Sequence, residues 1–171
     1  MILETASIYV WPLVGAIAAG AVIGFEREYR GSPAGLRTHV LVALTSALLM
    51  LVAVHEIRWL AATPTELIRI DPVRMAHGVL TGVGFISTGV ILREGANIRG
   101  LITAASLWIT SALGMLSGVG FFGLALAGAS AALIVLAGIN LTERWVPQRR
   151  YLDLAARNRV PDAPTAAELM L

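Results

Sequence analysis

The sequence contains no cysteine and no lysine, and only 14% of its 171 residues are charged. Without cysteine, disulfides, thiol redox chemistry and thiolate metal sites are excluded. Soluble domains carry about 25% charged residues, so this chain has too little polar surface to cover a soluble core. The length fits one domain, and 57% of the residues are hydrophobic. The composition excludes a soluble enzyme, a disulfide-rich secreted scaffold and a disordered tail, and it predicts a domain in a lipid bilayer.

Motifs for catalysis and nucleic-acid binding are missing as well. The sequence has no HExxH metal motif, no phosphate-binding loop and no Ser/His/Asp set. We therefore expect a protein that is not an enzyme, needs no cofactor and binds no nucleic acid.

Uncharged runs predict an all-α integral membrane protein with five transmembrane helices. Residues 5–25 carry no charge, and about 20 apolar residues suffice to cross the hydrocarbon core. The 43 residues from 100 to 142 contain no ionisable group, which is enough for two spans joined by a tight turn at residues 118–120. Two further runs, 40–54 and 78–92, are each 15 residues long and too short to span the core alone.

The two short runs draw ionisable residues into their helices. The 40–54 run must reach back to about Leu36, which takes in Arg37 and His39, and Ser32–Pro33 is typical of a helix start. The 78–92 run must start near Asp71–Pro72. This start places Arg74 and His77 about one turn apart on one helix face.

The placement of arginine predicts the orientation in the membrane. Ten of the 13 arginines lie in the connections between spans 1 and 2 and spans 3 and 4, and after span 5. The opposite side has three. The positive-inside rule then puts the N-terminus outside and the C-terminus in the cytoplasm. We expect a transmembrane domain over residues 1–142 and a short basic cytoplasmic tail, partly disordered, over residues 143–171.

One internal repeat links two of the predicted spans. Residues 35–50 align without gaps to residues 100–115, with eight of 16 positions identical at an offset of 65. Both copies follow a basic loop and point the same way, so the repeat is parallel, unlike the inverted repeats of many alternating-access carriers. Duplication of a hairpin (spans 1–2 and 3–4) is our interpretation, and coincidence among Leu- and Ala-rich segments is the alternative.

Small residues recur at spacings that let helices approach closely in lipid. We expect most of them to pack helices within one chain, and one such face to form a homodimer. The glycines expected to pack are Gly20, Gly24, Gly78, Gly82, Gly84 and Gly114.

The loop carboxylates Glu26, Glu28 and Glu94 each neighbour an arginine in the sequence. A Mg²⁺ site needs several oxygen ligands, whereas both loops have a net positive charge that repels Mg²⁺ and attracts phosphate or anionic headgroups. We expect most of these carboxylates and arginines to pair with one another and to fasten the loops to the helix ends.

The groups near the short runs allow two interpretations each. Asp71 is expected to cap a helix, with Arg74 as its partner; a cation ligand is the minority alternative, and Asp71 is the expected ligand if any metal binds. His77 and His39 are either proton-sensitive elements or hydrogen-bonded packing residues.

Several motifs resemble the signature of the MgtC/SapB family of bacterial inner-membrane proteins. In order along residues 10–140, they are Gly24-Phe25-Glu26-Arg27-Glu28, Ala34-Gly35-Leu36-Arg37-Thr38-His39, Asp71-Pro72, Gly82-Val83-Gly84-Phe85-Ile86, Gly89-Val90-Ile91, and Arg93-Glu94-Gly95-Ala96-Asn97-Ile98-Arg99-Gly100-Leu101 with Thr103-Ala104-Ala105-Ser106-Leu107-Trp108. The sequence departs from the family pattern at Ser87–Thr88 and Ile102. It is similar to a short form that lacks the C-terminal soluble domain of longer members.

The resemblance implies five spans and a role in adaptation to low magnesium and, in pathogens, in virulence. It implies regulation rather than Mg²⁺ transport, with the F-type ATP synthase or another inner-membrane protein as partner. The residues matched by motif make up most of a predicted functional polar cluster. We add the loop carboxylate Glu28 and the ionisable groups near the two short runs, which are His39, Arg74 and His77. The full cluster is Glu26, Arg27, Glu28, Arg37, Thr38, His39, Asp71, Arg74, His77, Arg93, Glu94, Asn97 and Arg99.

Three functional hypotheses follow. The first is a non-enzymatic inner-membrane regulator, dimeric, that acts through helix contacts with another membrane protein or with membrane lipids. The second is a transporter or channel for Mg²⁺ or another ion, based on Asp71 and His77. The third is a binder of anions or phospholipids that uses Arg37, Arg93 and Arg99.

Overall fold

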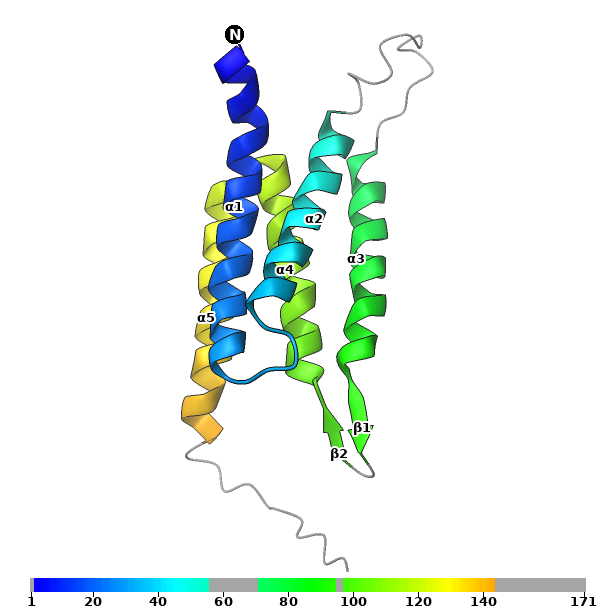
Figure 1. Ribbon diagram of the computed structural model, residues 1–171, viewed down its shortest axis with the longest axis vertical. Helices are drawn as coiled ribbons and strands as arrows, with labels where there is room; N and C mark the ends of the chain where they lie inside the picture. Colours follow the sequence, from blue (N-terminus) through cyan, green and yellow to red (C-terminus); the bar gives the residue numbers. More distant parts are fainter. Residues whose placement is uncertain (1, 56–70, 95–96, 144–171) are drawn as a thin grey trace, which may run out of the picture.

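The uncharged runs fold into helices, in which every backbone polar group of the interior is bonded within its own segment. The computed structural model describes residues 2–55, 71–94 and 97–143, and in this part of the chain there are five helices and one β-hairpin (Figure 1). The elements are α1 (Ile2–Tyr29), α2 (Leu36–Val54), α3 (Pro72–Val90), β1 (Leu92–Glu94), β2 (Asn97–Arg99), α4 (Leu101–Val119) and α5 (Phe122–Glu143). The predicted all-α class is confirmed. The short antiparallel hairpin β1–β2, which pairs Leu92 with Arg99, was not predicted.

Successive helices run in opposite directions. The end of α1, the start of α2, the hairpin and the end of α5 therefore lie together (Figure 1). We call this end of the bundle the hairpin end. The end of α2 and the start of α3 lie at the opposite end. In the centre, α2 packs against α4, with α1 and α3 on either side and α5 against α1 and α4.

Three helices in the described part are long and apolar enough to cross a membrane. They cover Ser7–Tyr29, Leu36–Val54 and Leu101–Val119, and a shorter apolar helix covers Phe122–Gly138. Helix α3 is not among them, because it carries Arg74 and His77 in its first two turns. Length and composition thus support three of the five predicted spans directly.

The second helix begins later than Ser32–Pro33, where the sequence predicted its start. Helix α2 starts at Leu36, with Gly35 as the N-cap. The hydroxyl of Ser32 instead forms a hydrogen bond of 2.8 Å with that of Thr103 in α4. A carboxylate from α1 does the capping, since the backbone N–H of Leu36 donates to Oε2 of Glu28 at 2.8 Å.

Two other predicted boundaries are confirmed. Asp71 caps α3 by accepting a hydrogen bond of 3.1 Å from the backbone N–H of Val73, and Pro72 follows as the first residue of the helix. Helix α4 ends before Gly120, whose φ of 92° is left-handed and favours glycine. Helix α5 extends to Glu143, one residue past the expected domain boundary, and the tail that follows, residues 144–171, lies outside the described residues.

The contact between α2 and α4 forms the centre of the bundle. A Cβ placed on Gly114 would overlap the carbonyl oxygen of Ala43, and one on Gly118 would lie 2.7 Å from the carbonyl oxygen of Ala47. Beside them, the hydroxyls of Ser46 and Ser111 form a buried hydrogen bond of 2.8 Å. In lipid, such close backbone approach and interhelical hydrogen bonds hold helices together. Since Ser46 and Ser111 are equivalent at the offset of 65, the two copies of the repeat contact each other.

The other expected packing glycines fall into two groups. A Cβ on Gly20 or Gly24 would come within 2.8 Å of the backbone of α2, so both allow α1 and α2 to pack closely. A Cβ on Gly78, Gly82 or Gly84 would meet no atom within 4 Å. The packing within one chain that we expected of these three is therefore not found in the described structure. Spacing alone does not indicate whether a neighbour is present.

Candidate functional site: a polar cluster at the hairpin end

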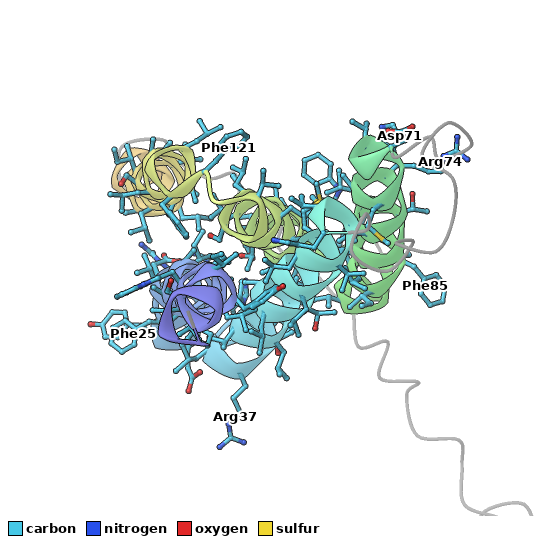
Figure 2. All side chains as sticks on the ribbon, turned by 90° about the horizontal axis from the view of Figure 1, so that it is seen from above. Phe25, Arg37, Asp71, Arg74, Phe85 and Phe121 are labelled. Atoms are coloured by element: carbon cyan, nitrogen blue, oxygen red, sulfur yellow. The ribbon has the colours of Figure 1, made fainter. Side chains whose placement is uncertain are left out.

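The predicted functional residues are divided between the two ends of the bundle. Those from α1, α2 and the hairpin lie at the hairpin end, whereas Asp71, Arg74 and His77 lie at the start of α3 (Figures 1 and 2). Since the ends are separated by the length of the bundle, these residues do not form one site.

Two arginines and one glutamate form a cluster of ion pairs at the end of α1. Nε and Nη2 of Arg27 donate to Oε2 and Oε1 of Glu26 at 2.5 and 2.8 Å, and Nε of Arg30 donates to Oε1 as well. The Arg27 residue is only 6% exposed. A buried guanidinium is tolerated where a carboxylate compensates it, so Glu26 is held in place as a structural counter-ion.

The residues at the start of α2 differ sharply in exposure. Arg37 is exposed and points away from the bundle (Figure 2), and among the described residues it makes no ion pair. Thr38 is half-buried, and His39 is fully buried. Residues two apart on a helix face roughly opposite ways, which explains why Arg37 meets the surroundings while His39 meets α4.

His39 joins α2 to α4 through hydrogen bonds. Its Nδ1 lies 2.8 Å from the carbonyl oxygen of Gly35, and its Nε2 lies 3.0 Å from Oγ of Ser106. A carbonyl oxygen only accepts, so Nδ1 carries a proton. The Ser106 hydroxyl also lies 2.8 Å from the carbonyl oxygen of Thr103. The geometry places His39 as a hydrogen-bonded packing residue, one of the two roles expected of it.

The hairpin brings the next predicted residues to the same end of the bundle. Its backbone pairs Arg93 with Ile98 and Glu94 with Asn97. The side chains of Arg93, Glu94 and Asn97 lie outside the described part of the structure, and Arg99 is exposed.

At the opposite end, the residues of α3 face outward. Nε of Arg74 lies 3.9 Å from Oδ2 of Asp71, and the two side chains are 87% and 52% exposed. An ion pair this exposed contributes little to stability. His77 is exposed too.

The described residues offer no assembled cation site. No three His, Asp or Glu side chains converge in the ranges that the structure describes. At the hairpin end, Glu26 binds Arg27 and Arg30, and Glu28 caps α2. The contacts of this cluster are structural. Together with the hydrogen bond between Ser32 and Thr103, they hold the connection between α1 and α2 against α4.

Sequence reasoning did not place Arg30, Ser32 and Ser106 in the site. The four-residue spacing from Glu26 to Arg30 is a signal for a helical ion pair and would have found the first. The contacts of Ser32 and Ser106 join residues 71 and 67 positions apart, and no local pattern predicts such distant partners.

Comparison with known proteins shows which sequences this chain is similar to. The model of the MgtC family matches residues 13–145. The chain is 42% identical over 155 residues to the putative magnesium transporter YhiD of Escherichia coli K12. It is 40% identical over 141 residues to the protein MgtC of Salmonella typhimurium 14028s, and 36% identical over 157 residues to the protein MgtC of Brucella abortus 2308.

Coverage differs among these relatives. The alignments include 90%, 82% and 91% of this chain, in the same order, but 71% of YhiD and only 54% and 58% of the two MgtC proteins. The chain thus spans little more than half the length of the MgtC proteins that it matches. No solved structure matches it.

Proposed function

Since the chain belongs to the MgtC family, we propose that it is a multi-pass protein of the bacterial inner membrane that regulates another membrane component during adaptation to low magnesium. It acts without catalysis, through contacts of its helices. In pathogens, the same role would serve survival inside a host.

The proposed topology has five spans, with the N-terminus outside and the C-terminus in the cytoplasm. Helix α3 has 19 residues and is about 28 Å long at 1.5 Å per residue, close to the thickness of the hydrocarbon core. The alternating helix directions and the excess of arginine at the hairpin end support this orientation.

The observation that carries the regulatory proposal is that the two carboxylates described at the hairpin end, Glu26 and Glu28, already have partners. Glu26 is neutralised by Arg27 and Arg30, and Glu28 is bonded to the backbone of Leu36. A Mg²⁺ pathway needs oxygen ligands that are free to replace water around the ion. Breaking the Glu26 pairs would also leave a buried arginine without a counter-ion, which is costly.

The centre of the bundle supports the same proposal. Along the crossing of α2 and α4, backbone atoms approach at Gly114 and Gly118, and Ser46 bonds to Ser111. Such a crossing is packed with protein atoms. We propose the outer surfaces of the helices as the contact sites for a partner, either the F-type ATP synthase that the family resemblance suggests or another inner-membrane protein, together with membrane lipids.

The second candidate is Mg²⁺ transport. It is favoured by the name of the E. coli relative, a putative magnesium transporter, and by the exposed carboxylate of Asp71 at the end opposite the hairpin. Ion flux separates the two candidates directly.

The test measures Mg²⁺ uptake into liposomes that hold the purified protein and a Mg²⁺-sensitive dye. We expect uptake no faster than in empty liposomes. Asp71→Asn is the matched variant, since asparagine caps helices as well as aspartate does. Uptake by the wild type that Asp71→Asn abolishes would refute the regulatory proposal as a full account.

A further inference from the structure

An open apolar groove, the α2–α3 groove, runs along the outer side of α2 and α3. Its volume is about 460 Å³, and its lining includes Leu41 and Thr45 from α2 and Gly78, Gly82 and Ile86 from α3. A Cβ on either glycine would meet nothing within 4 Å, so no described part of the chain covers them.

A second groove, between α1 and α4, holds α5 and is called the α5 groove. Ile23 of α1 and Leu113 of α4 share a buried cluster with Ala129 of α5. A Cβ on Gly15 would lie 3.1 Å from the ring of Phe122, at the start of α5. Small residues thus let α5 lie close to both of its neighbours.

The contacts between α1 and α2 recur between α3 and α4, so the two hairpins are related by an approximate two-fold axis. Positions shift by 63 from α1 to α3 and by 68 from α2 to α4. The second shift is about one helical turn more than the offset of 65 in the sequence, and the first is two residues less. The matching pairs, each in contact or in one buried cluster, are Ala16–Ala47 with Val79–Met115, Gly20–His39 with Val83–Leu107, and Gly24–Leu36 with Ser87–Ala104.

The same shifts carry the α5 groove onto the α2–α3 groove. The corresponding residues are Gly15 with Gly78, Ala19 with Gly82, Ile23 with Ile86, Ile109 with Leu41, and Leu113 with Thr45. Seen from above, α5 lies on one side of the bundle, and no described helix lies at the matching position beside α2 and α3 (Figure 2). The open groove is therefore shaped for an apolar helix that runs in the direction of α5.

We propose that helix α3 of a second copy of this chain fills the groove, so that two copies form a two-fold symmetric dimer along paired α3 helices. The inference rests on the proposed membrane topology and not on the regulatory role. Helices α3 and α5 run in the same direction (Figure 1), and two copies inserted alike present parallel α3 helices. The second α3 then has the direction that the groove requires.

The surface of α3 suits an isologous contact, in which the same residues meet from both copies. Arg74, Gly78, Gly82, Phe85 and Gly89 lie at spacings of three or four and are all exposed. Paired glycines allow the two backbones to approach closely, and the Phe85 residue, 83% exposed and pointing outward (Figure 2), gains cover. Asp71 adds a negative charge beside Arg74 in each copy, so the paired helix ends are electrically balanced.

Helix α5 of a second copy is a poorer occupant. Its small residues Ala125, Ala129 and Ala132 are already buried against its own chain. Only residues 120–121 connect it to α4, so it does not swing out to another copy. Helix α3, by contrast, has its glycines free.

Cross-linking in native membranes tests the proposed contact. Because the chain has no cysteine, Gly82→Cys provides a single thiol in the groove, and Ile134→Cys, at a residue 72% exposed on α5, is the matched control. After oxidation we expect a band at twice 18.1 kDa for Gly82→Cys and a much weaker one for Ile134→Cys. Equal cross-linking of the two would overturn the proposed interface.

A second variant separates dimerisation from folding. Gly82→Ile fills the groove where no atom stands in the way, and Gly123→Ile makes the same change at an equally open position on α5. By energy transfer between labelled copies in liposomes, we expect at least a tenfold weaker dimer for Gly82→Ile and no change for Gly123→Ile. Helix content should be normal in both.

Two results would refute the proposal. The first is a wild type that is monomeric in pure lipid, as expected if a lipid chain or another protein's helix fills the groove. The second is a Gly82→Ile variant that dimerises as strongly as the wild type. Mg²⁺ uptake would contradict the regulatory role but leave this result standing.

Discussion

The closest approach between α2 and α4 leads to a sharp stability prediction. Gly114→Ala adds a Cβ that overlaps the carbonyl oxygen of Ala43 and lies 2.8 Å from its Cα, where ordinary contacts are 3.4 Å or longer. Both atoms belong to backbone and cannot rotate away. The helices must therefore separate locally.

The cost can be estimated from its parts. Overpacking a tight contact costs about 1–3 kcal/mol, and a rigid backbone contact belongs at the upper end. Separation also weakens the hydrogen bond between Ser46 and Ser111, which is worth about 0.6 kcal/mol in a membrane protein. Alanine gains back about 1 kcal/mol in helix propensity. We expect a net loss of about 2–3 kcal/mol in the free energy of unfolding.

The assay is loss of helical circular dichroism as SDS is added to protein in mixed micelles. Gly84→Ala is the control, because its Cβ would meet no atom within 4 Å, and we expect it to be neutral or to stabilise by about 0.5–1 kcal/mol. Equal unfolding of wild type and Gly114→Ala would show that α2 and α4 are not in contact as described.

Three further predictions concern polar contacts and use the same unfolding assay. Glu28→Ala removes the cap of α2 and should cost about 1 kcal/mol, whereas Glu28→Gln, which keeps an acceptor, should cost less; equal losses would argue against the cap. Glu26→Ala leaves the buried Arg27 unpaired and should cost about 3 kcal/mol, most of which Glu26→Ala with Arg27→Met should recover. Ser46→Ala and Ser111→Ala should show a coupling of about 0.6 kcal/mol in a double-mutant cycle, and strictly additive losses would deny their hydrogen bond.

Local patterns predicted those features of the fold that depend on neighbouring residues. The uncharged runs gave the helices, Asp71–Pro72 marked the start of α3, and Gly120 ends α4 because its left-handed φ suits glycine. The start of α2 was wrong because Ser32, a good cap by itself, bonds to Thr103 across the bundle. The hydrogen bond to Thr103, which is distant in the sequence, outweighs the local preference of Ser32 for a helix start.

The site was less predictable than the fold. Arg37 and His39 both lie in the extension that the short second run needs to cross the core, yet one faces outward and the other is buried against Ser106. Helical geometry separates residues two apart, but the sequence does not say which face meets a neighbour. In the same way, Gly20 contacts α2 while Gly82 faces open space. Only the assembled bundle distinguishes them.

The central claim, regulation through a membrane partner, is tested most directly by isolating the protein under gentle conditions from the membranes of its own cells grown in low magnesium. We expect a second integral membrane protein in constant ratio to this chain. It should also be retained by the Glu28→Gln variant, which keeps an acceptor for the backbone N–H of Leu36. Isolation of this chain with lipid alone, together with Mg²⁺ uptake after reconstitution, would contradict it.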